Sequence, residues 1–334
     1  MTSHRTRPVI VTLAVLLLIA AVVAPAAEPL RVPILPAGER KLSWQKEEGT
    51  LTLLNFSRVV WTLHYGSDVA KPYFDPLGLL DGVSLVWNSP ADHPWHHGLW
   101  FSWKSINGVN YWEEDGKTGR SEGLTEVVSA QVSAAEDFSA RIQLNLAYHK
   151  PAEPAVLQET RLICVSAPDD QGGYAVDWRS TFKAGDHDLL FQGGTAGGGY
   201  AGLSARMASD TRDWRLIDGE GREDVPVAAN ALAKNLHGQH ARWMDLSLVC
   251  SGSGQPAGLA ILEHPSSLRH PTQWHAVLED KIPFGYFSPS PLWSEPYTVK
   301  AGQSFALAYR ILVHPLRLTG VELERRWKEF SAPE

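Results

Sequence analysis

Apolar and polar residues alternate over several long segments, and this period of two constrains the fold more than any other feature. A strand that buries one face shows such a period, whereas a helix repeats about every 3.6 residues. The alternation is clearest at 142–148, 174–178 and 305–313. Further strands are predicted from apolar stretches at 51–54, 59–65, 125–132, 156–164, 243–250 and 259–262.

Turn-forming residues separate these segments at short intervals, and helical periodicity is scarce. This combination is typical of an all-β protein and predicts a large antiparallel β-sandwich rather than alternating βαβ units. The exception lies at the C-terminus. Thr319 and Glu322 form a capping box, and Leu323, Trp327 and Phe330 share one helical face, which predicts a short helix packed on a sheet.

The N-terminal segment has the pattern of a secretion signal. Arg5 and Arg7 precede an apolar run at 9–23, and small residues follow at 24–27. The run of about 15 residues is shorter than the roughly 20 needed to span a bilayer, so a cleaved signal is favoured over a membrane anchor. We expect a signal peptide at 1–27, one β-sandwich domain at 28–334, no membrane insertion after cleavage, and a periplasmic or extracellular location.

Charge and cysteine content narrow the function classes. The formal net charge is -7 and no long Lys/Arg run is present, which argues against nucleic acid or anionic lipid as a partner. Cys164 and Cys250 are the only cysteines, so this is not a disulfide-framework protein. Whether the two pair is left open by the sequence.

Residues that carry out chemistry gather in two segments, each at a point where a strand candidate meets a His-Pro step. The first contains Asp92, His93, His96, His97 and Trp100, with Trp103 close by. The second contains Glu263, His264, Arg269 and His275. Because strand ends of an antiparallel sandwich can converge on one rim, we hypothesise that the two segments form a single site.

The residue types indicate a carbohydrate site. Imidazole titrates near neutrality and serves acid–base chemistry, while indole rings suit the apolar faces of sugars. A structural interpretation stands beside this one, because histidines in turns are often only hydrogen-bonded and tryptophans often belong to the core. A metal is the rival within the functional interpretation, but His-Pro-x-His-His is not a standard zinc or iron spacing, and we predict no metal or other cofactor.

Several of these positions match a known pattern. The sequence has Lys71-Pro72-Tyr73, Asp92-His93-Pro94 with His96, Gly98-Leu99-Trp100, Asn107-Gly108-Val109, Ala241-Arg242-Trp243-Met244-Asp245, His270-Pro271-Thr272 and Val313-His314. With these motifs, from about residue 71 to 314, the chain resembles the PmoA-like family of bacterial proteins, often labelled "methane oxygenase PmoA". The resemblance implies a galactose-mutarotase-like supersandwich, encoded among sugar oxidoreductases and sugar-processing enzymes.

The sequence differs from many family members at two places, and the family's methane-oxidising label does not fit it. Many members carry a Lys-Glu-Gly-Gly stretch where this chain has Gly199-Tyr200-Ala201-Gly202, and many have Arg where it has His97. The methane-oxidising label does not suit the chain, because the true methane monooxygenase subunit is an integral membrane protein and no apolar span follows the signal.

The leading hypothesis is an exported enzyme that acts on a glycoside or an oxidised sugar by hydrolysis, elimination or epimerisation. His96 and His275 are the expected acid–base pair, oriented by His93 and His264. The expected substrate contacts, to a small molecule or an oligosaccharide, come from Asp92, His97, Trp100, Trp103, Arg206, Glu263 and Arg269. The alternative is a non-catalytic sugar-binding or envelope scaffold protein that uses the same tryptophans.

Overall fold

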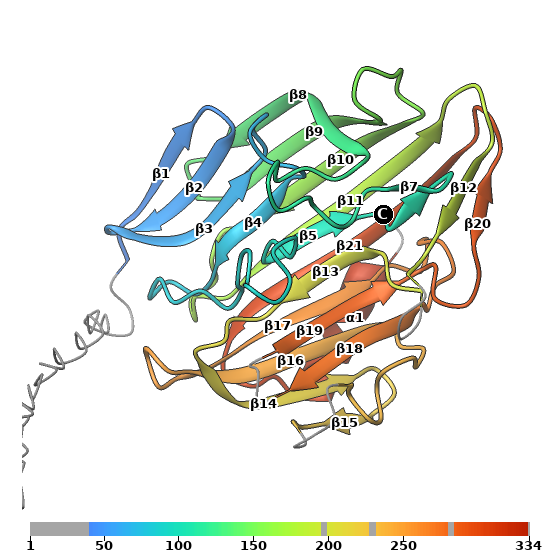
Figure 1. The fold of residues 1–334 in the computed structure, drawn as a ribbon. Helices are drawn as coiled ribbons and strands as arrows, with labels where there is room; N and C mark the ends of the chain where they lie inside the picture. The colour runs from blue at the N-terminus through green and yellow to red at the C-terminus, as the bar shows by residue number, and fades with distance from the viewer. Residues whose placement is uncertain (1–39, 195–198, 227–231, 280–283, 333–334) are drawn as a thin grey trace, which may run out of the picture. The chain divides into compact units, whose positions relative to one another are not determined.

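Antiparallel strands account for most of the regular structure in this protein. The computed structural model describes residues 40–194, 199–226, 232–279 and 284–332. Over these residues the strands form three sheets, of eight, nine and four strands, and neighbouring strands run antiparallel. The eight-stranded and nine-stranded sheets face each other as the two layers of a sandwich (Figure 1).

The eight-stranded sheet carries the site described below. In spatial order its strands are β1 (Leu42–Glu47), β2 (Thr50–Asn55), β3 (Arg58–His64), β4 (Tyr73–Leu77), β5 (Leu99–Ser102), β13 (Gly202–Arg206), β19 (Phe284–Ser290) and β18 (Gln273–Glu279). Strands β5, β13 and β19 are buried along nearly their whole length. Since side chains alternate between the two faces of a strand, both faces of this part of the sheet are covered.

The nine-stranded sheet forms the other layer. Its strands in spatial order are β15 (Glu223–Asp224), β14 (Thr211–Asp218), β16 (Trp243–Cys250), β17 (Pro256–Glu263), β21 (Ser304–Pro315), β11 (Tyr174–Ala184), β10 (Leu157–Val165), β9 (Ala140–His149) and β8 (Leu124–Ala134). A smaller sheet consists of β20 (Tyr297–Val299), β12 (Leu189–Gln192), β6 (Ser105–Ile106) and β7 (Val109–Asn110).

The main hydrophobic core fills the space between the two large sheets. Alternation along β11 directs Val176 and Trp178 into it, and β5 contributes Leu99 and Phe101 from the opposite layer. All four side chains are fully buried. Burying one such side chain contributes about 1.5–3 kcal/mol, so this core is the main source of stability.

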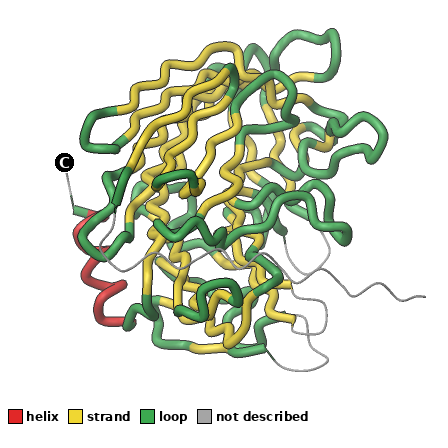
Figure 2. Tube along the Cα trace, turned by 90° about the vertical axis from the view of Figure 1, so that its left-hand side faces the viewer, coloured by secondary structure: helices red, strands yellow, loops and turns green. Residues whose placement is uncertain are grey.

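Helix α1 (Gly320–Ser331) packs on the outer face of the nine-stranded sheet (Figure 2). The hydroxyl of Thr319 accepts a hydrogen bond from the backbone N–H of Glu322, which caps the helix. Leu323 and Phe330 are buried against the sheet, and Trp327 packs beside them. The helix, its cap and its apolar face are therefore as predicted.

The structure confirms the predicted all-β fold, a large antiparallel β-sandwich with a short C-terminal helix. The strand predicted at 243–250 coincides with β16, and the other predicted strands overlap β2, β3, β8, β9, β10, β11, β17 and β21. Ile34–Glu334 form one compact unit. The predicted signal peptide at 1–27 lies outside the described residues. Cys164 and Cys250 are free thiols, and none of the described helices is long and apolar enough to span a membrane.

Candidate functional site

The outer face of the eight-stranded sheet carries aromatic side chains that do not belong to the main core. The alternation that directs Leu99 and Phe101 inward directs Trp100 outward, and Tyr286 points outward beside the inward Phe287. These outward rings belong to a buried cluster, which we call the aromatic site, of Tyr73, Trp100, Trp112, Val277 and Tyr286.

His96 packs directly on the aromatic site. Its ring centroid lies 4.9 Å from that of Trp100 and 5.3 Å from that of Tyr286. The loop that carries His96 meets the sheet at Gly98, whose φ is +76° and whose Cβ, if present, would lie 2.5 Å from the carbonyl oxygen of Phe74. Because only glycine tolerates both conditions, Gly98 fixes the place at which His96 reaches the sheet.

A carboxylate and a guanidinium hold His93 beside His96. The ring centroids of the two histidines are 4.6 Å apart. Nδ1 of His93 lies 2.8 Å from a carboxylate oxygen of Asp92, and Nη2 of Arg206 donates to both oxygens of that carboxylate at 2.8 and 3.0 Å. The guanidinium carbon of Arg206 lies 3.6 Å from the centre of the Phe284 ring. Arg206 is thus fixed on two sides, and it fixes Asp92.

These contacts keep Asp92 ionised. Partial burial acts to raise its pKa, but hydrogen bonds from His93 and Arg206, together with the charge of Arg206, outweigh burial and lower the pKa of Asp92. An ionised Asp92 favours the tautomer of His93 that carries its proton on Nδ1, which leaves Nε2 as an acceptor. The arrangement is that of a carboxylate orienting a general base.

His275 reaches the same face from β18. Its ring centroid lies 5.5 Å from that of Tyr286, 5.9 Å from Tyr200, 4.8 Å from His237 and 6.0 Å from Trp293. His96 and His275 thus both pack on Tyr286, and His93 joins them through its contact with His96. These three residues lie over the same face of the sheet, and that they act as one site stays a prediction.

The pKa values of His96 and His275 are too low for a general base at neutral pH. Burial lowers the pKa of His96 well below its usual value, and the nearby guanidinium of Arg206 lowers it further. Burial lowers the pKa of His275 to about 3, with a smaller contribution from His237. Both imidazoles are neutral at pH 7.

Several buried polar atoms without hydrogen-bond partners lie on this face. Among the described residues they include Nδ1 of His96, Nδ1 of His275, Nε1 of Trp100, and Nε and Nη1 of Arg206. Most buried polar atoms in proteins are hydrogen-bonded, and a buried donor or acceptor without a partner costs about 1–3 kcal/mol. Such a set is suited to a polar ligand, for which two neutral imidazoles and an indole N–H are hydrogen-bonding groups.

His97 has a structural role. Its Nδ1 lies 2.9 Å from the side-chain oxygen of Asn88, and its Nε2 lies 2.8 Å from Glu114, which also pairs with the buried Lys71 at 2.7 Å. The ring stacks on Tyr73. Because both ring nitrogens are engaged, the predicted contact between His97 and substrate is not supported.

Trp103 lies in the main core rather than on the aromatic site. It is fully buried and packs on Phe101, Phe182 and Phe191. Its position has the inward parity of Phe101, two residues earlier. The prediction that Trp103 stacks on a sugar is therefore wrong.

Most residues of the second predicted segment lie away from the aromatic site. Glu263, at the end of β17, is buried, accepts a hydrogen bond from the backbone N–H of Thr272 at 2.9 Å, and has its pKa raised by burial. His264 lies 2.7 Å from the hydroxyl of Ser266 and packs on Phe330 of α1.

Arg269 donates to the carbonyl oxygens of Pro291, Glu295 and Pro296, which ties two loops together. The segment crosses from β17 in the nine-stranded sheet to β18 in the eight-stranded sheet. Its two ends therefore belong to different layers, and only His275 reaches the aromatic site. The hypothesis that Glu263, His264 and Arg269 join His93 and His96 is not supported.

Several site residues were not predicted from the sequence. Tyr286 and Phe284 lie on β19, and His237 and Trp293 lie on loops. A signal for β19 exists, because its apolar residues occupy both parities of the strand, as expected where a sheet is covered on both faces. No comparable signal marks the loop residues. Across the described residues, no group of three or more His, Cys, Asp or Glu side chains is placed to hold a metal ion.

No curated protein matches the sequence. Solved structures match the chain at low identity. An α-galactosidase from Lactobacillus brevis has a TM-score of 0.40 at 8% identity, and the match covers 84% of this chain but only 40% of that enzyme. A putative aldose 1-epimerase from Klebsiella pneumoniae has a TM-score of 0.39 at 10% identity, with 90% and 86% of the two chains covered.

The family assignment corrects the resemblance stated above. The family model that matches the sequence is DUF6807, described as a family of unknown function, and the match spans residues 50–328. This range runs from β2 into α1. The resemblance to the PmoA-like family is therefore wrong. The chain belongs to DUF6807, a family of unknown function.

Proposed function

We propose that this protein is an exported carbohydrate-active enzyme that acts on a glycoside or an oxidised sugar by proton transfer at His93. The observation that carries the proposal is the Asp92–His93 pair, fixed by Arg206 at the edge of the aromatic site. An imidazole oriented by an ionised carboxylate is a general base, and the neighbouring rings suit the apolar faces of a sugar.

In this mechanism Nδ1–H of His93 donates to Asp92, and Nε2 accepts a proton from the substrate. In elimination or epimerisation that proton comes from a carbon of the sugar, whereas in hydrolysis it comes from the attacking water. Asp92 stays ionised because its pKa is lowered, so it stabilises the imidazolium that forms on His93. His93 then returns the proton to the leaving group or to the product.

His96 and His275 take a different role from the acid–base pair predicted from the sequence. A general base is most effective when its pKa lies near the working pH, and a pKa of about 3 makes His275 a poor one at neutrality. We assign both neutral rings to hydrogen bonds with sugar hydroxyl groups. Trp100 and Trp112 are buried in the aromatic site, and the half-exposed ring of Tyr200 contacts Trp112.

The test is a screen of the purified protein against glycosides and 3-keto-glycosides. Turnover of at least one of them is expected. His275→Ala should then raise KM more than it lowers kcat, because a binding group is lost. His264→Ala, which removes a histidine next to α1, is the matched control and should leave both constants unchanged.

A non-catalytic sugar-binding protein is the second candidate. The half-exposed rings of Tyr200 and Trp293 favour it, since aromatic platforms also occur in binding proteins. Saccharide binding without turnover in the same screen would support this candidate. Absence of both binding and turnover would contradict both functions.

A further inference from the structure

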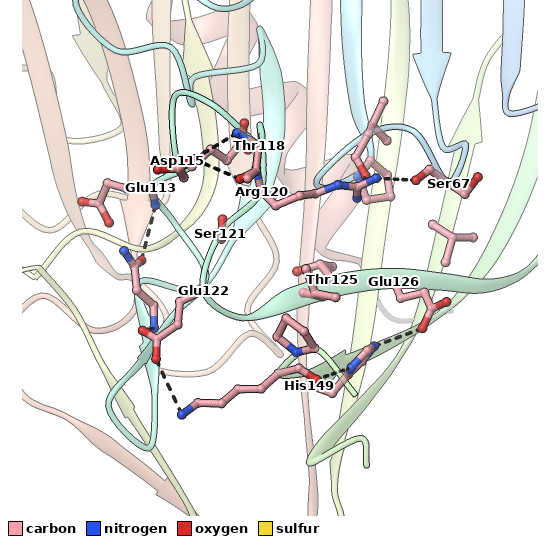
Figure 3. A pocket seen from close by; sticks show the side chains of 18 of the residues that line it. Ser67, Glu113, Asp115, Thr118, Arg120, Ser121, Glu122, Thr125, Glu126 and His149 are labelled. Atoms are coloured by element: carbon pink, nitrogen blue, oxygen red, sulfur yellow. Dashed lines mark hydrogen bonds and ion pairs between the residues drawn. The ribbon is translucent and has the colours of Figure 1, made fainter. Parts of the chain in front are cut away.

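A large cavity lies at the edge of the nine-stranded sheet, beside β8 and the end of β9 (Figure 3). Its volume is about 1090 Å³, which exceeds the roughly 300–1,000 Å³ of most small-ligand pockets. The walls come from the β3–β4 loop, the loop at 111–123, β8 and the residues after β9. A ligand of more than one sugar unit would fit this volume.

The cavity and the aromatic site share one wall, the loop at 111–123. Trp112 in this loop belongs to the aromatic site, whereas the next two residues, Glu113 and Glu114, line the cavity. Glu113 also accepts a hydrogen bond at 3.2 Å from the hydroxyl of Tyr200, whose ring packs on Trp112. The two places thus involve neighbouring residues of one loop.

Most carboxylates of the cavity have a basic neighbour. Four carboxylates lie next to basic partners: Glu113 beside Lys104, Glu114 beside Lys71, Glu122 beside Lys150, and Glu126 beside His149. A fifth, Asp115, accepts hydrogen bonds from its own turn. No strong net charge remains to select an anion or a cation, so a neutral polar ligand fits the lining best.

The lining also combines hydrogen-bonding and apolar surfaces. Figure 3 shows Glu122, Glu126, Ser121 and Thr125 around the cavity, and carboxylate oxygens accept hydrogen bonds from hydroxyl groups. Apolar side chains lie between these groups, namely Val69, Pro72, Leu124, Val127 and Pro151. A ring with hydroxyl groups on its rim and C–H groups on its faces matches this mixture.

We propose that the cavity binds further neutral sugar units of a chain whose reacting unit lies in the aromatic site. The substrate is then an oligosaccharide rather than a free monosaccharide. This inference rests on the proposed function, because it assumes that a sugar occupies the aromatic site. In this arrangement the cavity contributes part of the binding energy, and His93 carries out the proton transfer.

Isothermal titration calorimetry with two sizes of ligand tests the inference. The probes are methyl glycosides of glucose, galactose and xylose, and the corresponding tetrasaccharides. For the sugar that binds, the tetrasaccharide is expected to have a Kd lower by about tenfold or more, because the additional units bind at a high effective concentration. Glu126→Trp places an indole in the cavity and should bring the ratio of the two Kd values to about one.

Gln131→Trp is the matched control, because it adds the same ring to an exposed position of β8 outside the cavity. It should leave the wild-type ratio unchanged, and circular dichroism should show both variants to be folded. Equal Kd values for the two ligands in the wild type would contradict the inference but not the proposed function. The same holds if the ratio of the two Kd values in Glu126→Trp is as large as in the wild type. If the wild type binds no saccharide of either size, both the inference and the proposed function are contradicted.

Discussion

His93, His96 and His275 lie over one face of the eight-stranded sheet, and they differ in chemistry because the groups around them differ. His93 has an ionised carboxylate at Nδ1, whereas the described residues offer no hydrogen bond to the buried Nδ1 of His96 or His275. Sequence reasoning found all three from their place beside apolar strands. It assigned the acid–base pair to His96 and His275, because the contact that distinguishes His93 depends on Asp92 and Arg206, which lie 114 residues apart in the chain.

The pKa of His275 predicts how stability depends on pH. Its value of about 3 in the folded protein is below the ordinary 6.5, so between these values the unfolded chain binds more protons. Stability should therefore fall as pH drops through this window, by at most about 1.4 kcal/mol per pH unit from this residue. His275→Gln should reduce the fall.

Urea denaturation of the wild type and of His275→Gln at pH 6.5 and pH 4.5 measures this effect. The loss of unfolding free energy between the two pH values should be smaller in the variant. Equal losses in the two proteins would show that His275 is not buried as a neutral ring.

Strands were predictable from the sequence where one of their faces meets solvent or a polar layer. The alternation in β9, β10 and β11 arises because one face of each strand is buried in the core and the other is more exposed. Strands β5, β13 and β19 were not predicted. Strand β5 has only four residues, and Gly, Ser or Pro interrupt β13 and β19, so none of the three shows a clear period of two. These are the strands that carry the aromatic site.

The turn that delivers the histidine loop to the sheet should be intolerant of substitution. Gly98→Ala places a Cβ 2.5 Å from a backbone oxygen at a positive φ, and should lower the unfolding free energy by about 3 kcal/mol or more. Gly108→Ala is the control, since its φ is +80° but no atom lies within 4 Å of the added Cβ. Gly108→Ala should lower the unfolding free energy by only about 1–2 kcal/mol. Equal losses of thermal stability would contradict the role given to Gly98.

The C-terminal helix offers a second test at this scale. Thr319→Ala removes the hydroxyl that accepts from the N–H of Glu322, and should cost about 1 kcal/mol. Thr319→Ser keeps an acceptor and should restore most of the loss, as measured by urea denaturation. A loss of the same size in both variants would mean that the hydroxyl does not cap the helix.

At the scale of the whole molecule, the site is made of segments that lie far apart in the sequence. Asp92 and His93 come from the loop before β5, Arg206 ends β13, and His275 lies on β18. Sequence proximity joined Glu263 and His264 to this set, but the chain crosses between layers after β17 and separates them. Such a crossing depends on which sheet each strand joins, and local patterns do not specify it.

Export is a prediction about the whole chain. The charged, apolar and small-residue regions at 1–27 predict cleavage, with the mature protein beginning at Ala27 or Glu28. Expression of the full-length chain in a Gram-negative host, followed by cell fractionation and N-terminal sequencing, checks this. A full-length chain in the cytoplasmic fraction would contradict it.

The central claim is that His93, oriented by Asp92, transfers the proton. The most direct measurement is kcat/KM of His93→Gln on a glycoside or 3-keto-glycoside that the wild type turns over, with His264→Gln as control. The account predicts a loss of about 10²–10⁴-fold for His93→Gln and a value close to wild type for the control. A wild-type value of kcat/KM in His93→Gln would contradict it.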